Sequence, residues 1–334
     1  MSATLKDQIA LQQHDSHTYK VGYSNEWALG PILLGGCVAS LLYSVAQAHF
    51  TTTLLAQRQP DVHTLHVAFL RPCTAQESTV KVVDLKVGKG SSSIQLHLIQ
   101  RGETKCTAFA TSTDFAAALG PSANIPGGVL PALPPTPNFR RVEALEPDAN
   151  WLPSKTVGGV LPLLKRMTFL YPVNGQTTDG IIDYWCAFDR PEKFVGIHLA
   201  VLSDVAPSMS DTLLRTGGVF DAHKIYKLKK ETAEKTPGAT TILRNSLEEA
   251  AKGQFWNTTL SIDMQFKCRL PEKDMAWTFT RVRTRMLQGG RMDLDLTICD
   301  EEQTLICLVR QVMLVLETER RFKKDRKQPT SQKL

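Results

Sequence analysis

The chain has 334 residues, of which 42% are hydrophobic and 22% charged, and this balance is that of a globular protein long enough for two domains. No apolar run reaches about 18 residues and the polar first 17 residues lack an apolar core, so we expect neither a membrane span nor a secretory signal. The seven cysteines are widely spaced and odd in number. They argue for reduced thiols in an intracellular compartment, against a disulfide framework or a zinc site.

The formal net charge is +6, and much of the basic excess lies in residues 320–327, after the last apolar run. Surfaces that bind nucleic acid usually interleave aromatic with basic side chains, and this segment has only Phe322. We therefore expect a solvated tail and no nucleic-acid partner. A modest positive charge is compatible with an anionic ligand.

The first half of the chain reads as one helix followed by antiparallel strands. A short strand-like run at 19–29 precedes residues 37–53, whose helical periodicity and few charges predict a buried central helix. Strand-like runs then follow, separated by glycine-containing turns, at 63–70, 79–87, 93–99 and 105–113. This order is typical of an α+β fold.

Composition changes over 116–150, where proline is too frequent for a helix or a central strand, so the sequence predicts a linker across the surface. The second half then repeats the pattern of the first, which indicates internal duplication. We expect a helix at 194–214 and strands at 163–170, 180–188, 258–266, 275–285, 291–299 and 304–317.

A long insertion at 216–257 interrupts this repeat. Its charged, breaker-rich middle at 227–239 favours a mobile loop, and residues 242–252 have the pattern of a short amphipathic helix. Such an insertion is either a lid or a tolerated surface excursion.

One residue in the expected helix at 194–214 does not fit its surroundings. Asp204 follows Val201 by three residues and lies on the same apolar face. A buried carboxylate must be paired, hydrogen-bonded or protonated, and such groups concentrate at functional sites. The alternative is a partly solvated position near the helix end, with Pro207 just beyond.

Several short motifs in the same order resemble the acyl-CoA thioesterase II (TesB-like) family. They are GGCVASLL from Gly35, HTLHVAFLRP from His63, YWCAFDRPEKFVGIHLAVLSD from Tyr184, TTLSIDMQF from Thr258 and LICLVRQVML from Leu305. The linker and the insertion look closer to diverged fungal members. The resemblance implies a double hotdog fold, in which two tandem units each wrap an antiparallel sheet around a long helix.

The resemblance also implies a catalytic set. Family members activate a water molecule with an Asp, a Thr and a Gln, and the matching positions are Asp204, Thr259 and Gln311. The family's Asp-His-Ser motif reads Ser261, Ile262, Asp263 here, which removes an Asp and a His that would support the site.

The residues themselves are compatible with these roles. Gln311 interrupts an apolar strand, and a buried amide needs partners, which are either a water and a carboxylate or neighbouring backbone. Thr259 alternates with Ser261 and other polar residues that face solvent in a regular strand. The N–H groups of Gly35 and Gly36 are candidate oxyanion donors, although glycines also serve close packing.

Other catalytic centres find less support. His198 reads as a partly exposed helix residue rather than a base. The sequence contains no GxSxG elbow, P-loop or dinucleotide-binding GxGxxG. We expect no cofactor and no metal.

Three hypotheses follow. The first is a thioesterase that hydrolyses an acyl-CoA or a carrier-bound acyl or polyketide thioester with Asp-activated water. The second is an acyl-transfer, dehydration or cyclisation enzyme of a biosynthetic pathway, and the third is a non-catalytic acyl-binding protein.

The expected domains are residues 1–115 and 151–318 as hotdog units, 116–150 as linker and 319–334 as tail. We expect a cytoplasmic protein. The alternative is peroxisomal, because the C-terminal Gln332-Lys333-Leu334 approaches a peroxisomal signal. Assembly into a homo-oligomer, common among hotdog units, stays open.

Overall fold

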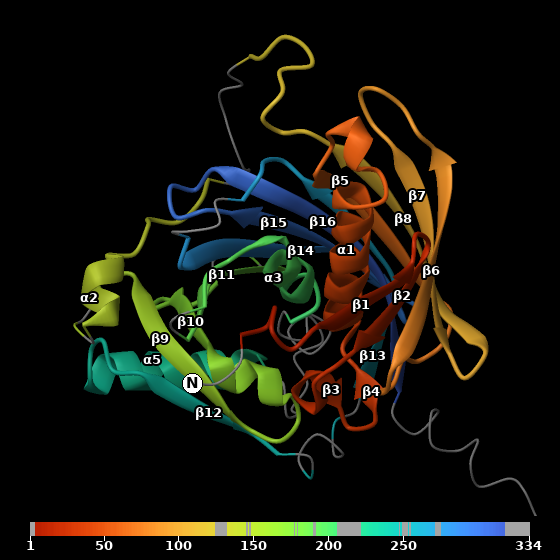
Figure 1. Ribbon diagram of the computed structural model, residues 1–334. Helices are drawn as coiled ribbons and strands as arrows, with labels where there is room; N and C mark the ends of the chain where they lie inside the picture. Colours follow the sequence, from red (N-terminus) through yellow and green to blue (C-terminus); the bar gives the residue numbers. More distant parts are fainter. Residues whose placement is uncertain are drawn as a thin grey trace, which may run out of the picture.

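The computed structural model describes residues 4–123, 132–144, 146, 148–176, 178, 180–189, 192–205, 222–246, 248, 253, 255–270 and 275–317. Within these ranges, almost all strands join one curved sheet of 14 strands (Figure 1). A separate two-stranded sheet contains β3 (Ala28–Leu29) and β4 (Ile32–Leu33). None of the described helices combines the length and apolar character that crossing a membrane requires.

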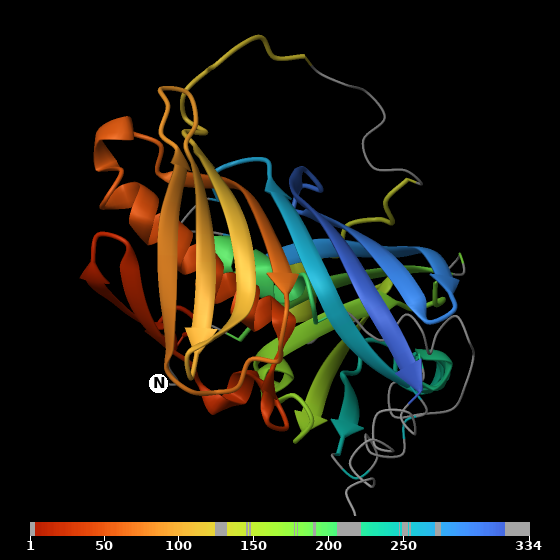
Figure 2. The same ribbon diagram turned by 90° about the vertical axis from the view of Figure 1, so that its right-hand side faces the viewer.

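The N-terminal half wraps six strands around α1 (Gly35–Thr51), which lies against their concave face (Figure 2). The helix is buried along most of its length, as its uncharged sequence predicts. The strands lie in the order β1-β2-β6-β7-β8-β5. Their bounds are β1 Ala10–Asp15, β2 Thr18–Gly22, β5 Asp61–Phe69, β6 Ser78–Lys86, β7 Ser93–Gln100 and β8 Glu103–Thr113.

The C-terminal half has a shorter central helix, α3 (Gly196–Leu202), and eight strands in the order β13-β16-β15-β14-β11-β10-β9-β12. Their bounds are β9 Trp151–Gly158, β10 Met167–Pro172, β11 Ile181–Phe188, β12 Thr241–Asn245, β13 Phe255–Phe266, β14 Trp277–Gln288, β15 Arg291–Cys299 and β16 Leu305–Glu317. Helix α5 (Ala222–Lys235) precedes β12, and the 3-10 turn η3 (Pro162–Arg166) precedes β10.

The two halves share one topology. In the first, chain order β2, α1, β5, β6, β7, β8 gives the spatial order β2-β6-β7-β8-β5. In the second, β11, α3, β13, β14, β15, β16 gives β11-β14-β15-β16-β13. The halves meet where β5 pairs antiparallel with β13, and α1 packs against α3. The expected double hotdog fold, of class α+β, is confirmed.

The later part of the linker, described at residues 132–144, 146 and 148–150, lies against the second half. It contains the short helix α2 (Phe139–Glu143), whose Phe139 stacks on Trp277 with ring centroids 5.6 Å apart. The indole of Trp151 donates to the carbonyl of Pro135 at 2.7 Å, and the Gln303 amide donates to that of Pro134 at 2.7 Å. These contacts fix a proline-rich segment whose one described regular element is the short helix α2.

Several expected elements differ in the structure. The strand predicted at 19–29 ends at Gly22, and the 3-10 turn η1 (Asn25–Trp27) follows, because Ser24 accepts from the Glu26 N–H and turns the chain. The strand predicted at 163–170 begins as η3, since Pro162 at its start favours a helical turn. The polar N-terminus, to which the sequence analysis assigned no helix or strand, forms β1 and pairs with β2.

The insertion also differs from its prediction. Residues 227–235 belong to α5 rather than to a loop, and residues 242–245 belong to β12 rather than to a helix. Strand β12 pairs in parallel with β9, so a partner distant in sequence overrides the local pattern. The helix predicted at 194–214 begins at Gly196 and ends at Leu202, and residues 206–214 lie outside the described residues.

Candidate active site

Asp204 lies just beyond the end of α3, facing the first turn of α1. Its Oδ2 accepts a hydrogen bond from the Gly36 N–H at 3.0 Å. The first N–H groups of a helix have no partner within the helix, and the helix dipole favours a negative charge there. The packing of the two central helices therefore places a carboxylate where α1 stabilises it.

Two glycines allow this close approach. A Cβ on Gly36 would lie 2.6 Å from the carbonyl oxygen of Val201 and 2.9 Å from Cβ of Asp204. A Cβ on Gly35 would lie 2.8 Å from Asp204 Oδ2. Because real Cβ atoms do not approach other atoms so closely, both positions require glycine for α1 and α3 to pack as they do.

Thr259 reaches the same carboxylate from β13, donating its hydroxyl to Oδ1 of Asp204 at 3.0 Å. A β-bulge makes this possible. Thr259 pairs with Met313 and Ser261 pairs with Val312, so Leu260 is an extra residue in β13. The bulge places Thr259 and Ser261 on opposite faces of the sheet, and the expectation that Thr259 shares a solvent-facing set with Ser261 is wrong.

Gln311 comes from the neighbouring strand β16 and is almost completely buried, at 1% exposure. Its Nε2 donates to Oδ1 of Asp204 at 3.0 Å. Val309 and Met313 flank it on the buried face of β16. The amide thus has the polar partner that a buried position requires, and that partner is a carboxylate.

Burial raises the pKa of Asp204 above its ordinary value. The hydrogen bonds from Gly36, Thr259, Gln311 and Gly35 act in the opposite direction, because they stabilise the charged form. A carboxylate with a raised pKa is a stronger base than an exposed one, and it can take a proton from a water molecule more readily.

The structure thus brings Asp204, Thr259 and Gln311 together from three elements. Gly35 and Gly36 open α1 as expected, and both of their N–H groups face Asp204. An oxyanion would have to compete with the carboxylate for them. Asp263 belongs to the three-residue stretch in which this chain differs from the family motif. It pairs with His66 of β5 and with Arg310 of β16. The residues on either side of it, Ile262 and Met264, face the core.

His198 is not the partly exposed residue that the sequence suggested. It is 2% exposed, its Nδ1 accepts from the Val195 N–H at 3.1 Å, and its Nε2 lies 2.9 Å from Glu192. Glu192 also accepts from Arg166 at 2.7 Å and from the N–H of Leu5. His198 therefore anchors the start of α3. The sequence feature that could have indicated its ionic partner is Glu192, an acid six residues earlier.

Tandem helix-and-sheet units, with an acid held between their central helices, define the class as hotdog enzymes. Models of the acyl-CoA thioesterase N-terminal and C-terminal domains match residues 23–113 and 140–315, and the chain belongs to this acyl-CoA thioesterase family. The protein is accordingly a hydrolase that acts on a thioester. The membership agrees with the resemblance seen in the motifs.

Individual proteins are similar over nearly the whole chain. The thioesterase-like protein TwmA of Talaromyces wortmannii is 24% identical, over 96% of this chain and 94% of its own. A thioesterase II candidate from Thermobifida fusca has the same fold at 15% identity and a TM-score of 0.66, covering 95% of this chain and 99% of its own. A hot dog fold protein from Alicyclobacillus acidocaldarius gives 15% identity and a TM-score of 0.65, covering the same shares.

Proposed function

We propose that this protein hydrolyses an acyl-CoA or a carrier-bound acyl thioester, with Asp204 as the general base that activates water. The observation that carries the proposal is the convergence of a helix N–H, a hydroxyl and an amide on one carboxylate. These donors hold Asp204 in one orientation without neutralising it. Family membership supplies the thioester as the reacting group.

Each polar group has a role in this proposal. Thr259 uses its only hydroxyl hydrogen on Asp204, so its oxygen still has lone pairs that accept a hydrogen bond from the attacking water. Gln311 has a second N–H besides the one it gives to Asp204. That N–H orients the water or donates to the thioester oxygen as negative charge develops there.

The reaction then balances with water as its only co-substrate. Asp204 removes a proton from water as the oxygen attacks the carbonyl carbon, and a tetrahedral intermediate forms. The carbon–sulfur bond breaks as the carbonyl re-forms, and protonated Asp204 returns its proton to the thiolate. The products are a carboxylic acid and a free thiol.

The test is thiol release from a panel of acyl-CoAs and acylated carrier proteins, using wild type and Asp204→Asn. We expect kcat to fall by about 10²–10⁴-fold in the variant, the usual contribution of a general base. Asn has nearly the same shape, so thermal unfolding of the variant should stay close to that of wild type.

Asp263→Asn is the matched control, because it makes the same change on β13 away from the site. Equal turnover by wild type and Asp204→Asn would exclude Asp204 as the base. Mass spectrometry of the acyl product separates the mechanisms, since hydrolysis gives the free acid. A transferred, dehydrated or cyclised product, or binding without turnover, would support the alternative hypotheses instead.

The compartment is a separate proposal. We infer a cytoplasmic protein. The alternative is the peroxisome, because residues 332–334, which lie outside the described residues, approach a peroxisomal signal. Removing these three residues from a fluorescent fusion should leave its distribution unchanged if the cytoplasm is correct.

A further inference from the structure

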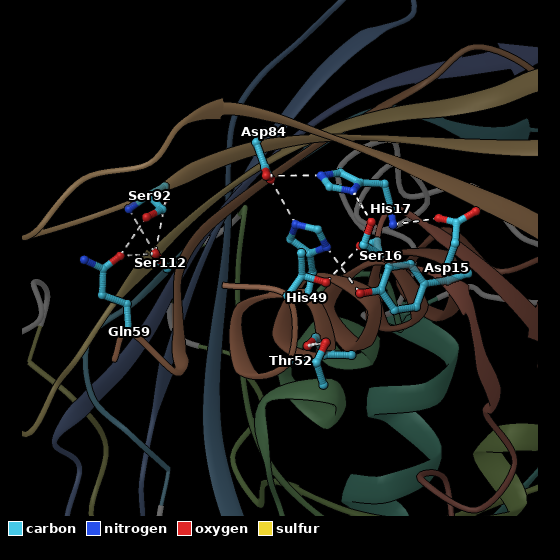
Figure 3. Close-up of polar contacts among 12 residues, drawn as sticks. Asp15, Ser16, His17, His49, Thr52, Gln59, Asp84, Ser92 and Ser112 are labelled. Carbon is cyan, nitrogen blue, oxygen red and sulfur yellow. Dashed lines mark hydrogen bonds and ion pairs between the residues drawn. The ribbon is translucent and has the colours of Figure 1, made fainter. Parts of the chain in front are cut away.

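A second cluster of titratable side chains, drawn in Figure 3, involves the end of α1 opposite to the one that faces Asp204. It contains His17 from the turn between β1 and β2, His49 from the last turn of α1 and Asp84 from β6. Thirteen residues separate Gly36 from His49, which is about 20 Å along a helix. The cluster is therefore independent of the proposed active site.

The three side chains point toward one another. His49 Nε2 lies 2.9 Å from Oδ1 of Asp84, and His17 Nε2 lies 3.2 Å from Oδ2. One ligand atom from each residue lies within 4.8 Å of the other two, and among the described residues no other group of three or more His, Cys, Asp or Glu is arranged in this way. His49 is completely buried, whereas the side chain of His17 is 42% exposed.

The second nitrogen of each ring is also held. Nδ1 of His17 lies 2.8 Å from the Ser16 hydroxyl, and Nδ1 of His49 lies 3.2 Å from the Tyr19 hydroxyl. Metal-binding histidines are characteristically oriented in this way by acceptors at the far nitrogen.

At both histidines a hydroxyl lies at Nδ1, and a hydroxyl can accept a hydrogen bond as well as donate one. Each ring can therefore keep its hydrogen on Nδ1 and turn the lone pair of Nε2 toward the Asp84 carboxylate. In that tautomer the two nitrogens and the carboxylate are three acceptors that face one another, which is the arrangement that a bound cation requires.

We propose that Nε2 of His17, Nε2 of His49 and a carboxylate oxygen of Asp84 bind a divalent transition-metal ion, with Zn²⁺ as the ion these donors suit. Zinc accepts nitrogen and oxygen ligands at about 2.0–2.2 Å, so tetrahedral ligands lie about 3.3 Å apart. The two imidazole nitrogens lie near this spacing from the Asp84 oxygens, at 2.9 and 3.2 Å, and one ligand atom from each residue lies within 4.8 Å of the others. A water molecule reaching the exposed side of His17 completes the coordination.

The consequence is structural rather than catalytic. The ion links the β1–β2 turn, the end of α1 and the inner face of β6, in addition to the backbone hydrogen bond from the Val82 N–H to the His17 carbonyl. Its charge offsets that of Asp84, which burial would otherwise penalise. Zinc should therefore stabilise the N-terminal half of the fold, and metal removal should not abolish thioester hydrolysis.

The test is titration of metal-free protein with Zn²⁺ in competition with a chromophoric chelator. We expect one site per chain, an affinity at least 100-fold weaker in both His49→Gln and His17→Gln, and a higher melting temperature of wild type with Zn²⁺. His17→Gln changes the half-exposed ligand and keeps the test valid if His49→Gln fails to fold. His63→Gln, which alters an exposed histidine of the same half, should bind as wild type does.

Cobalt substitution identifies the ligands. Nitrogen and oxygen donors give ligand-field bands without thiolate-to-metal charge transfer, and these bands should be lost in His17→Gln. Thiolate charge transfer would place the metal on cysteines and overturn the assignment. Equal zinc affinity of wild type and both variants would also overturn it, leaving a hydrogen-bonded His–Asp–His cluster.

Discussion

Asp204 illustrates how the environment of one residue sets its chemistry. Four hydrogen bonds stabilise its charged form, while burial favours the neutral form. The raised pKa shows that the effect of burial is the larger one. A fully neutral acid could not act as a base, and an exposed carboxylate would be a weak one. The site balances the two, which is the usual way in which enzymes adjust a carboxylate to a proton-transfer task.

This balance predicts the pH dependence of hydrolysis. The base acts only when deprotonated, so kcat/KM should fall as the pH decreases through the raised pKa of Asp204, with a midpoint above the ordinary Asp value of 3.8. The measurement is a pH profile of kcat/KM for wild type and Asp204→Asn, whose residual activity should lack this acid limb.

The titration of Asp204 does not itself unfold the protein. A group whose pKa is higher in the folded state takes up a proton on acidification and stabilises the fold, so this residue favours folding as the pH falls. Circular dichroism at each pH provides the check. An acid limb of equal midpoint in Asp204→Asn would assign the titration to another group.

The elements position these residues by packing and by register. Helix α1 presents its N-terminus to Asp204 only because Gly35 and Gly36 let α3 approach it. Strand β13 presents Thr259 only because the extra residue Leu260 shifts the alternation. In each case a local backbone feature, rather than the side chain alone, decides what the side chain contacts.

Gly36→Ala tests the helix contact. The added Cβ would meet backbone oxygens of Val201 and Ala200 at 2.6 and 2.8 Å, so α1 and α3 must separate. We expect a loss of stability of about 1–3 kcal/mol, as for other overpacked sites. We also expect a lower kcat, because the N–H that holds Asp204 moves away.

Gly90→Ala is the control for this prediction, since nothing lies within 4 Å of a Cβ at that position. Denaturant unfolding and thiol release measure the two effects separately. Wild-type stability and turnover in Gly36→Ala would show that the helices tolerate the methyl group and that close packing does not position the base.

At the scale of the whole molecule, distant segments are joined by buried polar groups as well as by the shared sheet. Arg269, which follows β13, donates to both carboxylate oxygens of Asp61 in β5 at 2.9 and 2.7 Å and to Asp114 at 2.8 Å. Glu192 joins the N-terminal segment at Leu5 to Arg166 and to α3 through His198. The Glu192 network is the more deeply buried of the two.

Glu192→Gln should weaken the fold and change its response to acid. Burial acts to raise the pKa of Glu192, but the bonds from His198 and Leu5 and the charge of Arg166 together lower it. A lowered folded-state pKa means that the carboxylate stabilises the fold above the ordinary value of 4.5. That contribution is lost as the pH falls through the lowered pKa.

The measurement is the free energy of unfolding of wild type and Glu192→Gln between neutral pH and pH 3. Wild type should be more stable by about 1–3 kcal/mol at neutral pH, and the difference should shrink on acidification. Glu103→Gln, which alters an exposed carboxylate, serves as the control. A constant difference across the range would mean that the charge of Glu192 does not contribute.

The sequence by itself determined the architecture, because that information is local and repeated. Few charges and helical periodicity marked α1, alternation and glycine turns marked β5–β8 and β13–β16, and the repeat of that order indicated two units. Short motifs then identified Asp204, Thr259 and Gln311 as a set. Their proximity follows from the shared topology, in which equivalent elements of the second unit surround α3.

Only the tertiary structure decided which side chains meet. Alternation placed Thr259 toward solvent, and the bulge at Leu260 reversed it. Local charge predicted a loop where α5 forms, and pairing with β9 made a strand of residues predicted as helix. His17, His49 and Asp84 are separated by more than 30 residues at each step, so no local pattern relates them. Contacts of this kind arise when the sheet closes around the helix, and the free energy of a buried polar group depends on those neighbours rather than on its own type.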